Sequence, residues 1–197
     1  MLTMFISVYL KMFMILTPFF VISAFLSLTQ KYTAAERQQT AIKVTLAVIV
    51  TCFVFFVFGR YIFALFGITL DAFRIGAGAV LFISAIGLIQ GTRIVASTDP
   101  DQELAVVPLA IPITVGPGTI GALLVMGASL KGMPDKIVAS AALLAAILSV
   151  GGLLLVSGRL EKVIGQQGLV ILTKLTGLFV SAIAAQIFFT GVKNFLG

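Results

Sequence analysis

Apolar residues gather into long runs that alternate with short polar segments along the chain. A helix needs about 20 mostly apolar residues to cross the hydrocarbon core of a bilayer. Runs of that order predict six membrane-spanning helices, at residues 2–28, 41–65, 72–91, 105–130, 137–157 and 169–193. Because no long polar insertion separates them, we expect the six spans to pack together as one transmembrane domain.

The polar segments carry helix-start signals. Thr33 and Glu36 have the spacing of a capping box, in which each side chain bonds to the backbone N–H of the other residue. The second helix is therefore predicted to begin there, ahead of its apolar run. Asp71 and Arg74 are three residues apart where the third span begins, a spacing that favours a local ion pair.

The two halves of the chain resemble each other at a shift of about half its length. Pro18 corresponds to Pro117 at a shift of 99, and Arg74 corresponds to Lys174 at a shift of 100. Each half holds three predicted spans. Because three is odd, the second half must lie upside down in the membrane relative to the first. An inverted repeat of this kind, with a break in the first helix of each half, is typical of secondary transporters.

This pattern predicts the domain organisation. The most polar stretch, at 96–103, is the expected linker between repeat one at 1–95 and repeat two at 104–197. The predicted fold class is an all-α membrane protein with six transmembrane helices, arranged as two inverted three-helix repeats with broken helices one and four.

The first and fourth spans contain the expected breaks. Pro18 lacks a backbone N–H and disfavours helical geometry at Thr17. The fourth span holds three prolines and two glycines between Pro108 and Gly118, which a regular helix does not sustain. Irregular backbone survives at membrane depth only where it is buried in protein or lines a cavity. For Pro18 alone, a plain kink between packed helices remains an alternative.

Broken helices offer their ends to a ligand. A helix that restarts after Pro117 has free N–H groups near Gly118, which favour an anion, and the half-helix that ends near Thr114 exposes carbonyls, which favour a cation. Two opposed breaks can therefore hold a zwitterion. The expected substrate-binding residues are Thr17, Pro18, Phe19, Phe20, Thr114, Gly116, Pro117, Gly118, Thr119 and Gln186.

Three of these interpretations have plainer alternatives. The glycines near the fourth-span break, Gly121 included, can simply let helices pack closely. Gln186 can bond across helices instead of serving a ligand. Lys11, the one basic residue well inside an apolar run, can extend its amine along a tilted helix to the membrane surface.

Composition narrows the class of protein. Of the 197 residues, 60% are hydrophobic and 10% are charged, and the mean hydropathy is +1.19, so lipid must cover the outside. The net charge of +6 does not indicate nucleic acid, because the basic residues are spread over segment ends, where they anchor at headgroups. They divide evenly between the two sides, so the orientation in the membrane is not predicted.

The chemistry-bearing residues are few. Histidine is absent, and the single cysteine, Cys52, lies inside an apolar run. The acidic residues all lie in connections or at segment ends, so no buried carboxylate is expected to carry protons. We expect no cofactor and no enzymatic activity. Coupling to Na⁺ or H⁺ is left open, with backbone carbonyls and hydroxyls as the groups that would hold Na⁺.

The stretch 107–120, Val-Pro-Leu-Ala-Ile-Pro-Ile-Thr-Val-Gly-Pro-Gly-Thr-Ile, resembles the hallmark of the MarC family of bacterial inner-membrane proteins. Residues 66–68, 73–78, 177–178 and 186–188 also match, and the resemblance covers essentially the whole chain. It implies six helices and transport of small neutral amino acids such as glycine and alanine. The family usually has Asn or Asp before the first-span proline and Gly two residues after it. Here Thr17 and Phe20 occupy these positions, which is expected to reshape the pocket.

The predicted function is therefore a secondary transporter of small neutral amino acids that works by alternating access in the bacterial inner membrane. Its expected partners are the amino acid and the lipid bilayer, with a homo-oligomer through small-residue faces left open and no nucleic acid. The alternative is a passive channel, or an exporter for another small solute.

Overall fold

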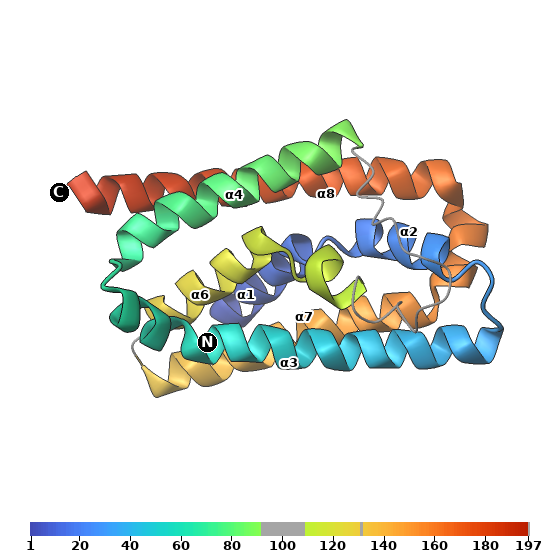
Figure 1. Ribbon diagram of the computed structural model, residues 1–197, viewed down its shortest axis with the longest axis horizontal. Helices are drawn as coiled ribbons and strands as arrows, with labels where there is room; N and C mark the ends of the chain where they lie inside the picture. The colour runs from blue at the N-terminus through green and yellow to red at the C-terminus, as the bar shows by residue number, and fades with distance from the viewer. Residues whose placement is uncertain (92–108, 131, 197) are drawn as a thin grey trace.

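The computed structural model describes residues 1–91, 109–130 and 132–196, and within these ranges every regular element is a helix (Figure 1). The predicted linker at 96–103 and the beginning of the predicted fourth span lie outside them. The elements are α1 (Leu2–Ile15), α2 (Pro18–Leu28), α3 (Ala34–Phe66), α4 (Leu70–Gln90), the π-helix η1 (Leu109–Thr114), α6 (Pro117–Ser129), α7 (Met133–Leu155) and α8 (Ser157–Leu196).

Five helical stretches in the described part of the chain are long and apolar enough to cross a membrane: Leu2–Leu28, Ala34–Phe58, Leu70–Gln90, Met133–Leu155 and Ser157–Leu196. A shorter apolar helix, Pro117–Ser129, lies where the fourth span was expected. Large apolar side chains are exposed along these helices, for example Val50, Ile83 and Leu178. Such a surface requires lipid around it.

The first span consists of two helices. The α1 helix ends at Ile15, α2 begins at Pro18, and Thr17 between them has a left-handed backbone with φ +48°. That conformation is rare for a β-branched residue and costs roughly 1–3 kcal/mol. Pro18 stands at the first position of α2, where its missing N–H leaves no helical hydrogen bond unmade.

The second half contains a similar sequence of elements. Gly116 has an extended backbone between η1 and α6, and Pro117 occupies the first turn of α6. Figure 1 shows α2 and α6 beginning near the middle of the molecule and running to opposite ends.

The third helix of each half follows a glycine in the left-handed region. Gly67 ends α3 with φ +64° just before α4, and Gly165 interrupts α8 with φ +72°, so that a short helical segment precedes the long one. Only glycine adopts this backbone without strain.

The predicted local contacts at the helix starts are confirmed. The Thr33 N–H donates to Glu36 Oε2 at 2.8 Å while the Glu36 N–H donates to Thr33 Oγ1 at 3.3 Å, which completes the capping box at the start of α3. Arg74 Nη1 lies 2.7 Å from Asp71 Oδ1, which makes the expected ion pair in the first turn of α4.

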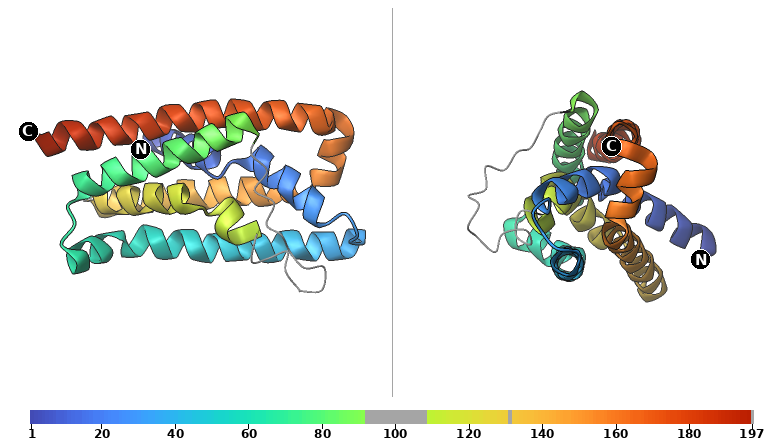
Figure 2. Two further views of the ribbon diagram at one scale, coloured as in Figure 1. Left: turned by 45° about the horizontal axis from the view of Figure 1, so that its top comes forward. Right: turned by 90° about the vertical axis from the view of Figure 1, so that its right-hand side faces the viewer.

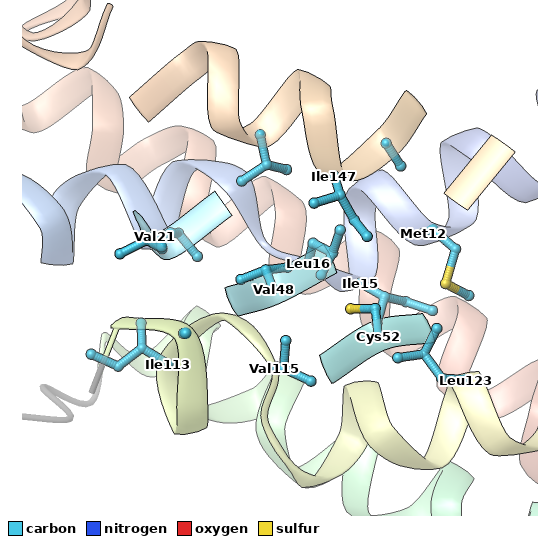
Figure 3. Packing of buried hydrophobic residues seen from close by; sticks show 14 of the residues in the cluster. Met12, Ile15, Leu16, Val21, Val48, Cys52, Ile113, Val115, Leu123 and Ile147 are labelled. Carbon is cyan, nitrogen blue, oxygen red and sulfur yellow. The ribbon is translucent and has the colours of Figure 1, made fainter. Parts of the chain in front are cut away.

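The helices pack in a pattern that pairs the two halves. The α4 helix lies along α8, and α3 packs against α7 (Figures 1 and 2). The first span, α1 with α2, packs against α7 and α8, while η1 with α6 packs against α3 and α4. The core lies where these elements meet in the middle of the bundle, and Figure 3 shows Leu16, Val48, Val115 and Ile147 grouped there.

Candidate functional site

A cavity of about 560 Å³ opens at one end of the bundle, between α2, the end of α4 and the first half of α8. Phe20 and Ile113 belong to its apolar lining. Its polar lining consists of Ser23, Ser27, Gln30, Glu161, Gln166, Thr173 and Lys174. The Ser23 hydroxyl donates to the Phe19 carbonyl at 3.0 Å and that of Thr173 to the Leu169 carbonyl at 2.8 Å. Both hydroxyl oxygens can still accept a hydrogen bond from a ligand.

A smaller cavity of about 250 Å³ lies between α1, the start of α4, α6 and the last part of α8. Its lining is mostly apolar and includes Ile15 and Ala122. The polar groups that reach it are Lys11, Arg74, Gln186 and Thr190.

The two cavities lie at opposite ends of the same helices. On α4, Arg74 lines the smaller cavity and Leu88 the larger one, and the rise of a helix places these residues about 21 Å apart along the axis. On α8, the larger cavity is lined by residues of 161–174 and the smaller by residues of 183–190.

On each of the four lining segments, the stretch between the cavities contains buried residues. Between Ile15 and Phe20 lies Leu16, which is 1% exposed, and between Ile113 and Ala122 lies Val115, which is 0% exposed. We use the name central layer for eight of these buried residues: Leu16, Ala77, Leu81, Thr114, Val115, Thr119, Thr176 and Val180. Figure 3 shows Leu16 and Val115 between Ile113 on one side and Ile15 and Met12 on the other.

The expected substrate-binding residues do not share one cavity. Phe20 lines the larger cavity and Gln186 lines the smaller. Neither of these two cavities is lined by the other eight. Of those eight, Thr114 and Thr119 belong to the central layer, Pro18 and Gly118 are buried, Thr17, Phe19 and Gly116 are half-buried, and Pro117 is exposed.

The glycines of the fourth-span break lie in close helix contacts. A Cβ atom on Gly118 would be 2.7 Å from Leu81 Cδ1 and 2.9 Å from its Cα, and one on Gly121 would be 2.6 Å from Ala77 Cβ. Both contacts join α6 to α4. In this structure, Gly118 and Gly121 therefore allow α4 and α6 to pack closely, as the plainer of the two sequence interpretations expected.

The two cavities correspond to each other under the repeat. Ser27 of the larger cavity and Met126 of the smaller are 99 positions apart, as are Leu88 and Ile187. Further pairs at the same shift are Ser23 with Ala122, Leu26 with Val125 and Gly91 with Thr190. Each cavity also holds one member of the basic pair Arg74 and Lys174.

Sequence reasoning missed the polar lining of the larger cavity on α8. Glu161 and Thr173 gave no signal, because one stands in a connection and the other is a single hydroxyl in an apolar run. Lys174 did give one, since it matches Arg74 in the repeat. In the described part of the chain, no three His, Cys, Asp or Glu side chains group in a way that could hold a metal ion.

Comparison with known proteins decides the family. The model of the MarC family of integral membrane proteins matches residues 2–196. The chain belongs to the MarC family. A UPF0056 membrane protein of Methanocaldococcus jannaschii is 34% identical, with 98% of this chain and 97% of the relative covered. This MarC-family chain is thus an integral membrane protein, as its composition indicated.

Relatives from bacteria show the same full-length similarity. A UPF0056 membrane protein of Aquifex aeolicus is 29% identical over 98% of this chain and 94% of its own length. The UPF0056 membrane protein YhcE of Escherichia coli is 28% identical over 94% of this chain and 90% of its own length. No solved structure matches the chain.

Proposed function

We propose that this MarC-family protein is a secondary transporter of small neutral amino acids that works by alternating access in the bacterial inner membrane. The observation that carries the proposal is the pair of repeat-related cavities, which open at opposite ends of the bundle and are separated by the buried central layer. A solute on either side reaches the layer but does not cross it without a change of conformation.

An inverted repeat supports this mechanism, because exchanging the conformations of two inverted halves reverses the side to which a site opens. The packing is consistent with such an exchange. The first span contacts α7 and α8, and its counterpart, η1 with α6, contacts α3 and α4. In Figure 1, each of the three spans of the first half runs opposite to its counterpart in the second.

Two glycine contacts between α4 and α8 show how the two halves of the chain correspond. A Cβ atom on Gly78 would be 2.7 Å from the Phe188 nitrogen, and one on Gly177 would be 3.0 Å from Ile89 Cγ1. Gly78 and Gly177 are 99 positions apart, and so are Ile89 and Phe188. The α4–α8 contact therefore maps onto itself when the two halves are exchanged.

We place the transported molecule at the helix breaks during the exchange. The α2 and α6 helices begin at Pro18 and Pro117, beside the central layer, and their free N–H groups favour a carboxylate. Opening the layer from one side would join that cavity to the breaks. The left-handed Thr17 is the point at which α1 and α2 can change their mutual angle, since the two helices share no continuous hydrogen-bond ladder there.

The cavity sizes and the family resemblance favour a small neutral substrate. The smaller cavity, about 250 Å³, is below the roughly 300–1,000 Å³ typical of sites for drug-sized ligands. Phe20 reduces the room in the larger one. In the larger cavity Lys174 and Glu161 supply opposite charges, which suits a zwitterion better than a net ion.

Counterflow in proteoliposomes tests the function. The purified full-length chain would be reconstituted, the vesicles loaded with unlabelled alanine, and uptake of labelled alanine or glycine followed. A transporter gives saturable, transient accumulation of label above its outside concentration. A passive channel gives equilibration without accumulation. No alanine or glycine flux under any imposed Na⁺, H⁺ or substrate gradient would contradict the proposal.

A further inference from the structure

The smaller cavity brings together three polar residues that the sequence places inside apolar spans. Lys11 lies in the third turn of α1, and Gln186 and Thr190 lie one turn apart in α8. All three line the same cavity, together with Arg74. Lys11, Gln186 and Thr190 are exposed, so these polar groups from helices that are distant in sequence border a mostly apolar cavity on its open side, where an entering solute can reach them.

The two cations of this cavity differ in their partners. Arg74 Nη1 donates to Asp71 Oδ1 at 2.7 Å and its Nη2 to Ser129 Oγ at 3.3 Å. Asn194 Nδ2 also donates to Asp71 Oδ1, at 3.3 Å, which helps to hold the carboxylate that neutralises the guanidinium. Among the described residues, no carboxylate lies within ion-pair distance of Lys11. The uncompensated positive charge of the cavity is therefore that of Lys11.

We infer that Lys11 binds the carboxylate of the transported molecule in the smaller cavity, with Gln186 and Thr190 as its polar companions. The inference rests on the proposed function and adds a recognition residue to it. An ammonium group beside an apolar wall is stabilised by an anion that arrives with the ligand. The Thr190 hydroxyl donates to the Gln186 carbonyl at 2.6 Å, which leaves its oxygen free to accept from a ligand amine.

This role is specific to one of the two cavities. The residue 99 positions after Lys11 is Ala110, which is buried and carries no charge. The larger cavity instead holds Lys174 together with Glu161. The alternative for Lys11 is an amine that extends to the membrane surface, in which case its removal leaves ligand binding unchanged.

Binding measured on the full-length protein in uncharged detergent tests the inference. The probes are alanine, propionate, which keeps the carboxylate, and ethylamine, which keeps the amine. We expect alanine and propionate to bind and ethylamine not to bind. Lys11→Met should weaken binding of alanine and propionate about two- to fivefold, because the ligand carboxylate loses the charge of an exposed amine, and Lys11→Arg should retain most of the affinity. The control is Lys43→Met, since Lys43 is exposed on α3 and lines neither cavity.

The inference would be overturned by equal affinities of wild type and Lys11→Met for alanine and propionate. It would also be overturned if ethylamine bound as strongly as propionate, or if no carboxylate bound. Displacement of bound alanine by inorganic phosphate but not by propionate would indicate a lipid phosphate site instead. If Lys11→Met does not yield folded protein, Lys11→Arg and the comparison of probes on the wild type still decide. Lys11-dependent propionate binding without amino acid flux would remove the proposed transport and leave the carboxylate site. Amino acid flux together with a Lys11→Met affinity equal to that of wild type would remove the carboxylate site at Lys11 and leave the proposed transport.

Discussion

Gly78 on α4 lies directly against the backbone of Phe188 on α8. A Cβ atom on Gly78 would be 2.7 Å from the Phe188 nitrogen and 2.9 Å from its Cα, distances that real Cβ atoms essentially never show. Because the obstacle is backbone, no side-chain rotation relieves it. The two helices that form the longest contact in the bundle therefore depend on the absence of a side chain at this position.

Gly78→Ala should consequently destabilise the protein by about 1–3 kcal/mol, since α4 and α8 must move apart. Gly76→Ala is the matched control, because a Cβ atom there has no neighbour within 4 Å. It should leave stability unchanged or raise it by about 0.5–1 kcal/mol through helix propensity. Thermal unfolding in detergent measures both. Similar midpoints for the two variants would contradict the packing described for Gly78.

The contact between Gly151 on α7 and Thr45 on α3 permits a coupled test. A Cβ atom on Gly151 would be 2.5 Å from Thr45 Oγ1 and 2.6 Å from its Cγ2, so the obstacle is a side chain. Gly151→Ala should destabilise the fold, and Thr45→Ala should recover much of the loss, with a coupling free energy of about 0.5–3 kcal/mol.

The neighbouring Gly152→Ala is the control for this pair, because a Cβ atom there is in open space. It should show no coupling to Thr45→Ala in the same double-mutant cycle. Additive effects of Gly151→Ala and Thr45→Ala on the thermal midpoint would mean that α3 and α7 do not meet at these residues.

The position of the two cavities predicts labelling from opposite sides of the membrane. In a Cys52→Ala background, Ser27→Cys places a thiol in the larger cavity and Thr190→Cys places one in the smaller. A membrane-impermeant maleimide should modify the first from one side only and the second from the other side only. Leu16→Cys, in the central layer, should stay unmodified from both. Labelling of Ser27→Cys and Thr190→Cys from the same side would remove the alternating-access arrangement.

Phe20 lines the larger cavity and therefore limits the size of what enters it. Phe20→Ala should raise uptake of leucine relative to alanine by roughly tenfold, since the pocket then accepts the added methylenes. Phe19→Ala is the matched control, because Phe19 is a half-buried neighbour that lines neither cavity. Competition uptake in proteoliposomes gives both ratios. An unchanged ratio in Phe20→Ala would show that Phe20 does not set the size limit.

Whether a contact can be predicted from the sequence depends on how far apart its partners lie along the chain. The capping box of Thr33 and Glu36 and the ion pair of Asp71 and Arg74 were predictable, because their partners are three residues apart and the chemistry is local. The missing N–H of proline is equally local, and Pro18 and Pro117 both stand in the first turn of a helix.

The placement of the candidate site was less accessible. Gly76 and Gly78 are two residues apart on one helix, yet one faces open space and the other a backbone. The position of α8 determines which of the two glycines faces a neighbouring backbone, and that position follows from packing over the whole bundle. For the same reason the sequence suggested one pocket at the breaks, whereas the described cavities lie on either side of a buried layer.

The backbone at Thr17 leads to a prediction about stability. Its φ of +48° lies in the left-handed region, which disfavours threonine but in which asparagine is several-fold enriched. This gives a physical reason for the Asn or Asp that MarC-family proteins usually have before the first-span proline. Thr17→Asn should therefore stabilise the protein by about 0.5–1 kcal/mol.

Thr17→Ala is the appropriate comparison, because alanine loses the branched side chain without gaining a preference for positive φ. It should fall below Thr17→Asn in thermal midpoint. If Thr17→Asn instead lowered the midpoint to the value of Thr17→Ala or beyond, the left-handed turn between α1 and α2 would not be a feature of the folded protein, and the first span would be a continuous helix with a proline kink.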